Sequence, residues 1–123
     1  REVSMAENMS IRGLTHRYYE AWAAQDRERV DALLHDGLEF ISPQGSFGSA
    51  VSFLSASWTR SAGLAGVRFV REVYQGDRAF VILRWLNQDG STFTDAEYLE
   101  SSHGRIKTIL VVSYDPVLGK LRE

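Results

Sequence analysis

Hydrophobic positions follow two different spacings in this chain. Between Ser10 and Ala24, apolar side chains recur every three or four residues, which is the spacing of a helix with one buried face. Beyond Ala65, they alternate with other residues over long runs separated by short turns, which is typical of strands. The pattern predicts helices near the start of the chain and an antiparallel sheet after them.

Capping and turn residues set the expected limits of these elements. Ser10 and Asp26 are good N-caps for two successive helices, and the second is expected to end near Gly37. Pro43 and the Gln44-Gly45 pair stop a short strand. The expected order is helices over residues 10–24 and 26–37, a strand over 38–42, a helix over 49–62, and strands over 67–74, 79–86, 92–101 and 106–114.

The Asp89-Gly90 pair predicts a two-residue hairpin turn, and this turn fixes a register between its strands. In that register Arg84 lies opposite Asp95, and Ile82 lies opposite Glu97. Side chains alternate between faces. One face is therefore expected to carry Phe80, Ile82, Arg84, Leu86, Phe93, Asp95, Glu97 and Leu99, and the other Val81, Leu83, Trp85, Thr92, Thr94, Ala96 and Tyr98.

Both faces of this predicted hairpin contain large apolar residues. A sheet that is apolar on both sides has to be covered on both sides. Three helices can cover only one face of so long a sheet, so the other face is expected to meet a second copy. The pattern therefore predicts an α+β fold that forms a homodimer through its outer sheet face.

Length and composition favour one domain. A chain of 123 residues with 44% apolar residues can bury a core without disulfides, and it contains no cysteine. We expect a single domain over residues 1–123, with a core over about 10–116 and flexible ends at 1–9 and 117–123.

Charge and motif content exclude several classes of function. The net charge is −2 and basic residues are scattered, so neither nucleic acid nor membrane is an expected partner. The three histidines, His16, His35 and His103, fall in separate elements, so no metal site is expected. The glycines lack phosphate-loop spacing and no cofactor is predicted. The absence of cysteine and of a long apolar segment favours a cytoplasmic protein.

Asp95 and Glu97 are the first candidates for chemistry. Residues two apart on a strand point to the same side, so both carboxyl groups would share one face with Arg84. If that face is buried, burial and mutual repulsion raise the carboxyl pKa values, while the arginine lowers them. Such a pair suits acid–base chemistry, with one group protonated and one ionised. The alternative is an Arg84–Asp95 ion pair near the rim with a solvated Glu97.

The order of elements resembles the nuclear transport factor 2-like superfamily, and the SnoaL-like polyketide cyclases and ketosteroid isomerases look closest. The residues that carry the resemblance are Arg17-Tyr18, Asp26, Ser42-Pro43 and His103-Gly104-Arg105-Ile106. It spans about residues 10–116. The resemblance implies a cone-shaped, curved antiparallel sheet, of cystatin-like type, wrapped around an N-terminal helical hairpin and a third helix. It also implies a deep apolar pocket for a small molecule, commonly in a homodimer.

The resemblance also implies roles for single residues. Tyr18 lies where the isomerases place a tyrosine that donates a hydrogen bond to a developing enolate. Ser42 replaces the general-base aspartate that those enzymes carry before the proline, and a serine cannot abstract that proton unaided. Glu97, or Asp95, falls near an acidic residue of the third long strand. The sequence leaves open whether Ser42 faces the pocket or only forms a turn.

Three hypotheses of function follow. The first is a cofactor-independent isomerase, cyclase or dehydratase that acts on a small cyclic carbonyl compound, with Asp95 or Glu97 moving the proton, Tyr18 binding the oxygen, and Arg84 tuning the carboxyl groups. The second is a non-catalytic dimeric binder, and the third an interaction module with an exposed Trp85–Tyr98 patch. In the first two, the expected pocket wall is formed by Trp22, Ser42, Trp58, Phe69, Phe80 and Ile82.

Overall fold

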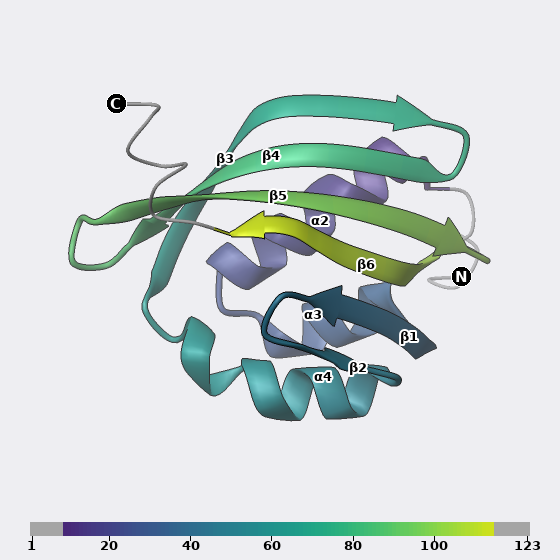
Figure 1. The fold of residues 1–123 in the computed structure, drawn as a ribbon, viewed down its shortest axis with the longest axis horizontal. Coiled ribbons are helices and arrows are strands. Elements are labelled where there is room, and N and C mark those ends of the chain that lie inside the picture. Colours follow the sequence, from purple (N-terminus) through teal and green to yellow (C-terminus); the bar gives the residue numbers. More distant parts are fainter. Residues whose placement is uncertain (1–8, 115–123) are drawn as a thin grey trace.

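The chain folds into a curved sheet with three α-helices against it (Figure 1). The computed structural model describes residues 9–114. Its elements are α2 (Ile11–Ala23), α3 (Arg27–Leu33), β1 (Leu34–Ser42), β2 (Gly45–Phe47), α4 (Ala50–Ser57), the 3-10 turn η1 (Thr59–Ser61), β3 (Leu64–Gln75), β4 (Arg78–Asn87), β5 (Thr92–Ser102) and β6 (Arg105–Tyr114). The predicted order of helices and strands is confirmed, with the short strand β2 added.

Both predicted caps of the helical hairpin are present. The Ser10 hydroxyl accepts a hydrogen bond from the Gly13 N–H at 3.1 Å, and the Asp26 carboxylate accepts one from the Arg29 N–H at 3.1 Å. Helix α3 ends at Leu33, earlier than the expected end near Gly37. Leu34 is already extended and pairs with Ile106 of β6, so sheet pairing overrides the local helical pattern there.

Helix α4 begins at the Ser49 cap and is shorter than the predicted helix. Its buried side chains are Ala50, Phe53 and Leu54, whereas Val51 is 74% exposed. Helix α4 therefore turns Phe53 and Leu54 toward the core and Val51 toward solvent. The 3-10 turn η1 then carries the chain from α4 to β3.

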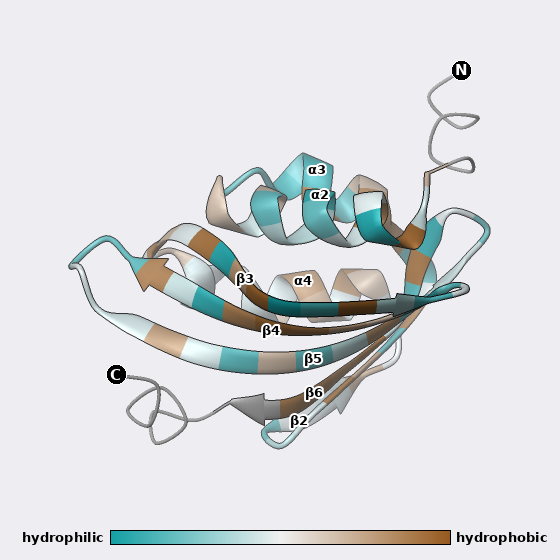
Figure 2. Cartoon of the chain, turned by 90° about the horizontal axis from the view of Figure 1, so that it is seen from above, coloured by the Kyte–Doolittle hydropathy of each residue, from teal (hydrophilic) through white to brown (hydrophobic). Residues whose placement is uncertain are grey.

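The six strands form one sheet in the order β2-β1-β6-β5-β4-β3. β1 and β6 are parallel, and the other neighbours are antiparallel. Figure 2 shows the helices on one side of this curved sheet and none on the other. The sheet bends partly through bulges, since Val70 of β3 and Val112 of β6 are extra residues in their ladders.

The predicted register of the β4–β5 hairpin is wrong by one residue. The Asn87 N–H donates to the Ser91 carbonyl at 2.8 Å, and the Gly90 N–H donates to the Asn87 carbonyl at 2.9 Å. Three residues, 88–90, therefore form the loop, and Gly90 has a φ of 89°, as its last position requires. Because side chains alternate along a strand, a shift of one residue places every side chain of β4 on the opposite sheet face relative to β5.

In the observed register Leu83 pairs with Asp95 and Val81 pairs with Glu97. The carboxyl pair consequently shares its face with Val81, Leu83 and Trp85, all of which are buried. Phe80, Ile82 and Arg84 lie on the opposite, outer face, which corrects the prediction that they share a face with the carboxyl groups.

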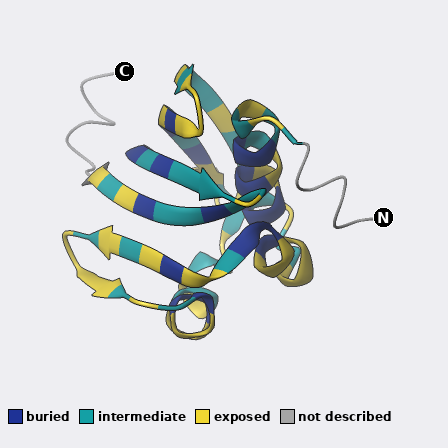
Figure 3. Ribbon diagram, turned by 90° about the vertical axis from the view of Figure 1, so that its right-hand side faces the viewer, coloured by how far each residue is buried: buried dark blue, intermediate teal, exposed yellow. Residues whose placement is uncertain are grey.

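Figure 3 shows the alternation of buried and exposed positions along the strands. No helix covers the outer face within residues 9–114, and it exposes several large apolar side chains. These are Val73, Phe80, Leu86, Leu110 and Val112, with exposures of 63%, 38%, 43%, 37% and 50%.

The expected flexible ends lie almost entirely outside the described residues. Met9 is the exception, because it is described and packs against the core. None of the helices within residues 9–114 is long and apolar enough to span a bilayer.

Candidate active site

A cavity of about 580 Å³ lies between the helices and the inner face of the sheet. Its buried lining combines aromatic rings with two carboxyl groups: Tyr18, Tyr19, Trp22, Phe53, Trp85, Asp95 and Glu97. The remaining lining residues are partly or fully exposed, so the cavity has a mouth at the surface: Phe40, Ser42, Gln44, Gly45, Phe47, Ser57, Arg60, Ser61, Leu64, Asn87, Phe93 and Val111.

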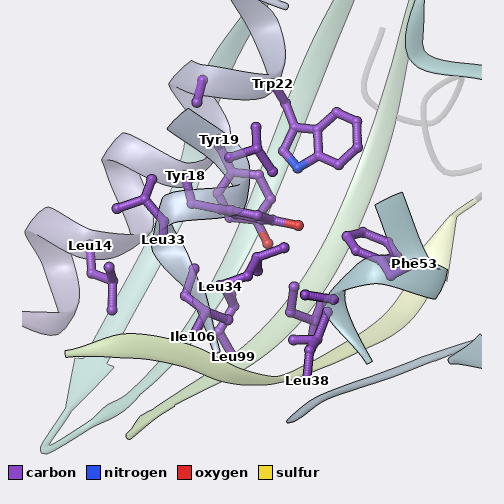
Figure 4. Close-up of a cluster of buried hydrophobic side chains, with 14 of the residues drawn as sticks. Leu14, Tyr18, Tyr19, Trp22, Leu33, Leu34, Leu38, Phe53, Leu99 and Ile106 are labelled. Carbon is purple, nitrogen blue, oxygen red and sulfur yellow. The ribbon is translucent and has the colours of Figure 1, made fainter. Parts of the chain in front are cut away.

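Helix α2 supplies one wall through adjacent turns. Tyr18 and Trp22 are four residues apart and Tyr19 lies beside them, so all three fall on the buried side of the helix. The exposed fraction is 2% for Tyr18, 1% for Tyr19 and 7% for Trp22. Figure 4 shows these side chains projecting from the helix into the interior. The rings of Tyr18 and Trp22 meet edge to face, with centroids 6.4 Å apart.

Strand β5 supplies the two carboxyl groups from the opposite wall. Asp95 and Glu97 alternate with outward-facing positions, and their exposures are 6% and 7%. The Tyr19 hydroxyl donates a hydrogen bond to Glu97 Oε1 at 2.6 Å. Residues 78 positions apart in the chain are thereby joined inside the core.

Burial raises the pKa of the Glu97 carboxyl well above its ordinary value. The negative charge of Asp95 and a hydrogen bond between the two carboxyl groups raise that pKa further, while the Tyr19 hydroxyl lowers it. Burial also raises the pKa of Asp95, and the hydrogen bond with Glu97 opposes that rise. Both carboxyl groups therefore hold a proton more strongly than usual, and the rise in pKa is the larger for Glu97.

Both tyrosines of α2 remain protonated donors. Burial raises the pKa of Tyr18 and of Tyr19 well above the ordinary value, and the charge of Glu97 is the second cause for each. The Tyr19 proton is committed to Glu97. The Tyr18 hydroxyl oxygen accepts a hydrogen bond from the Trp22 indole N–H, and Tyr18 lines the cavity, so its own proton can be donated to a ligand oxygen there.

Asp95 offers the matching acceptor. Its Oδ1 atom is buried and has no hydrogen-bond partner among the described residues. A buried carboxylate oxygen without a partner is costly unless a ligand or water completes it. The arrangement thus combines an available base, a protonated neighbouring acid and a phenol donor around one space, which is suited to moving a proton on a bound molecule.

The fate of the predicted site residues is mixed. Tyr18, Trp22, Ser42, Asp95 and Glu97 all line the cavity. The Ser42 hydroxyl is used within its turn, since it donates to the Gly45 carbonyl at 3.0 Å and accepts from the Gln44 N–H at 3.2 Å. Ser42 therefore lies at the mouth as a turn residue, and both of these hydroxyl contacts are with backbone groups.

The other predicted residues lie outside the lining. Arg84, Phe80 and Ile82 are on the outer face for the register reason given above, and Arg84 donates to the Thr92 hydroxyl at 3.4 Å. Trp58 packs behind Trp22, with ring centroids 4.8 Å apart. Phe69 stacks on His16 at 3.9 Å instead of facing the cavity.

His16 is half-buried and joins helix α2 to the sheet. Its Nε2 lies 2.6 Å from Glu72 Oε1 of β3, and the same oxygen accepts a hydrogen bond from the Tyr74 hydroxyl at 2.9 Å. This cluster joins α2 to the sheet beside the cavity wall and holds the helix that carries Tyr18 and Tyr19.

Sequence reasoning missed Tyr19 as a site residue. A helix face that buries positions 14, 15, 18, 21 and 22 also covers position 19, so a wider buried stripe on α2 was the available signal. Within residues 9–114, no group of three or more histidine or acidic side chains is arranged to hold a metal ion.

A family model for the SnoaL-like domain matches residues 15–109. The chain belongs to this family. The match covers both walls of the cavity, including Tyr18, Tyr19, Asp95 and Glu97. No curated protein sequence matches the chain closely.

Solved structures share this fold at low sequence identity. A candidate ketosteroid isomerase from Kribbella flavida is 19% identical, with 86% of this chain and 81% of that chain covered and a TM-score of 0.72. A candidate polyketide cyclase from Pseudomonas putida is 20% identical, with coverage of 89% and 95% and a TM-score of 0.67. An NTF2-like protein of unknown function from Cytophaga hutchinsonii is 16% identical, with coverage of 94% and 97% and a TM-score of 0.73.

The family match confirms the predicted superfamily, and these neighbours confirm the predicted fold class. At such identities they establish the fold alone, so the chemistry of this chain rests on its own residues.

The raised pKa of Glu97 predicts that the stability of the protein depends on pH. The Glu97 pKa is 4.5 in the unfolded chain and higher in the folded protein. At pH values between these two, the folded state holds more protons than the unfolded state. The free energy of unfolding should therefore be highest below this window and fall as pH rises through it, by at most about 1.4 kcal/mol per pH unit for one proton. Urea unfolding from mildly acidic to mildly alkaline pH measures this.

Glu97→Gln keeps the side-chain shape and removes the titration, so its stability curve should be flatter. The matched control is Glu39→Gln, at an exposed position of β1. The plot of unfolding free energy against pH for Glu39→Gln should run parallel to that of wild type. A parallel plot for Glu97→Gln would contradict the raised pKa of Glu97.

Proposed function

We propose that this protein is a cofactor-independent enzyme that moves a proton on a small cyclic carbonyl compound. The single observation that carries the proposal is the buried Asp95–Glu97 pair, which faces a cavity together with the hydroxyl of Tyr18. The family and its isomerase and cyclase neighbours support the same class of chemistry.

Asp95 is the proposed general base. Its Oδ1 has no partner among the described residues, and Glu97 retains the proton of the pair. A base with a raised pKa holds a transferred proton more strongly, yet it is still ionised at neutral pH if the rise is moderate. Glu97, held by Tyr19, is a positioning residue that donates to Asp95 and stabilises its ionised form.

Tyr18 is the proposed oxyanion donor. As Asp95 takes a proton from the carbon next to the carbonyl, negative charge develops on the carbonyl oxygen, and a phenol in a low-dielectric site stabilises it. The resulting enolate then takes the same proton back at another carbon, attacks a second carbonyl whose oxygen takes that proton from Asp95, or expels a neighbouring hydroxyl that leaves with that proton as water. These outcomes correspond to isomerisation, aldol-type cyclisation and dehydration.

A non-catalytic binder is the second candidate. It is favoured by Ser42, which occupies the position before Pro43 where the isomerases carry their general-base aspartate. The Ser42 hydroxyl is engaged in a turn and does not replace that base. The same aromatic cavity would then bind a ring compound without reaction. The interaction module proposed through a Trp85–Tyr98 patch loses its basis, since Trp85 is only 5% exposed.

We also propose that a second copy covers the outer sheet face. Exposed clusters of large apolar side chains mark interfaces in soluble proteins. The observed register strengthens this proposal, because Phe80 and Leu110 lie in one row across the outer face, on either side of Tyr98.

Proton exchange tests the catalytic proposal. Cyclohexanone and 2-tetralone in deuterated buffer should exchange their α-protons faster with the protein, followed by proton NMR. Asp95→Asn removes the base and should lower the enzyme-dependent rate by about 100-fold or more. Tyr18→Phe removes the oxyanion donor and should lower that rate by roughly 10- to 1,000-fold.

The matched controls are Asp36→Asn, at an exposed position of β1, and Tyr98→Phe, whose hydroxyl donates to Glu100 on the sheet face opposite the cavity. Both should leave the exchange rate within about twofold of wild type. Equal exchange rates for wild type and Asp95→Asn would reject catalysis by this pair and leave the binding function.

Sedimentation velocity tests the dimer. The wild-type protein should sediment as a dimer at micromolar concentration, and Leu110→Asp should sediment as a monomer because a charge is costly in an apolar interface. Val51→Asp changes an exposed apolar residue of α4, away from the sheet, and should remain dimeric. A monomeric wild-type protein would contradict the proposal.

A further inference from the structure

The polar groups of the cavity are divided between its interior and its mouth. The buried interior holds the acids Asp95 and Glu97. The exposed mouth holds Arg60, which is the one lining residue in the described part of the chain that carries a full positive charge. The acidic groups therefore lie at the buried end of the cavity and the positive charge lies at its mouth.

Arg60 is carried by a well-anchored backbone. It is the central residue of η1, where the Ala62 N–H donates to the Thr59 carbonyl at 3.3 Å. The Ser61 hydroxyl donates to the Trp58 carbonyl at 2.8 Å. Just beyond η1, the Gln88 N–H donates to the Gly63 carbonyl at 2.7 Å, which ties this turn to the β4–β5 loop.

Arg60 has no ion pair within residues 9–114. Some exposed arginines have acidic partners, as Arg12 has Glu72 at 3.3 Å and Arg29 has Asp26 at 3.8 Å, but only Arg60 lines the cavity within the described residues. A guanidinium group at the rim of a cavity has five donors in a planar fork that suits a carboxylate. Around it, Ser57 and Asn87 add polar side chains to the same rim.

We propose, building on the function proposed above, that the ligand is a ring compound with an anionic substituent, and that Arg60 binds this substituent. A carboxylate is the group that best fits the guanidinium fork. The apolar ring lies against Trp22, Phe53 and Phe93, and the carbonyl end reaches Tyr18 and Asp95.

Electrostatics makes this orientation favourable over its reverse. The ionised Asp95 repels an anionic group at the buried end, and desolvation of that group would add to the cost. At the mouth, the same group meets Arg60 and keeps part of its hydration. Arg60 thus holds the carboxylate of the ligand at the mouth, and the carbonyl end of the ligand lies next to Asp95.

Matched probes test the inference. The neutral probe is 2-naphthol, whose hydroxyl mimics an enolate oxygen, and the anionic probe is 6-hydroxy-2-naphthoate, which adds a carboxylate at the far end of the ring. Binding is measured by isothermal titration calorimetry at low salt. Wild type should prefer the anionic probe by roughly three- to tenfold, as expected for an ion pair that is partly exposed to solvent.

Arg60→Gln should abolish this preference and leave the affinity for 2-naphthol unchanged. Arg71→Gln changes the net charge equally at an exposed position of β3, where the side chain donates to the Val70 carbonyl, and should keep the preference. High salt should reduce the wild-type preference because it screens an exposed pair.

The outcomes separate this inference from the proposed function. An equal preference in wild type and Arg60→Gln would overturn the role of Arg60, even if ketone exchange depends on Asp95. A preference that requires Arg60, in a protein without ketone exchange, would support the anionic ligand and reject the catalysis. Failure of wild type to bind 2-naphthol would overturn both, since it would exclude a ring from the cavity.

Discussion

Two carboxyl groups side by side in an apolar interior cannot both be ionised, and the rest of the site follows from this constraint. Asp95 and Glu97 are placed together by the two-residue period of β5, and both are almost fully buried. Burial and mutual repulsion therefore raise the pKa of both groups and favour a state in which the pair holds one proton. The Tyr19 hydroxyl, at 2.6 Å from Glu97 Oε1, occupies one oxygen of the pair, and Asp95 Oδ1 is buried without a hydrogen-bond partner among the described residues. The result is a base and an acid made from two similar side chains.

The fold supplies what such a pair requires. A curved sheet with helices on one side leaves a hollow between the two layers, and an aromatic lining keeps the dielectric low there. Bulges help the sheet to bend, and one of them, at Val112 of β6, lies beside Ala96 and Glu97. Helix α2 is held against β3 by the His16–Glu72 contact and against β5 by Tyr19. The same helix thus closes the core and delivers the phenol groups of the site.

Local signals predicted the elements well and the tertiary register poorly. Ser10 and Asp26 cap the helices that the periodicity indicated, because a cap depends on neighbours in the chain. The Asp89-Gly90 pair suggested a two-residue loop, but the loop includes Gln88, and this single residue moved Arg84, Phe80 and Ile82 to the outer face. The alternation of β5 correctly placed Asp95 and Glu97 on one face, and the packed structure shows that this face is the inner one. Tyr18 was favoured over Tyr19 by resemblance, and only the packed structure shows which tyrosine reaches Glu97.

The central claim is that Asp95 and Glu97 share one proton inside the cavity. Carbon-13 NMR of labelled side-chain carboxyl groups, followed through a pH titration, tests it most directly. The account predicts that Glu97 remains protonated far above its ordinary pKa of 4.5, and that Asp95→Asn lowers the pKa of Glu97 because a neighbouring charge is removed. Independent titration of the two groups near their ordinary values of 3.8 and 4.5, unchanged by substitution of the partner, would contradict it.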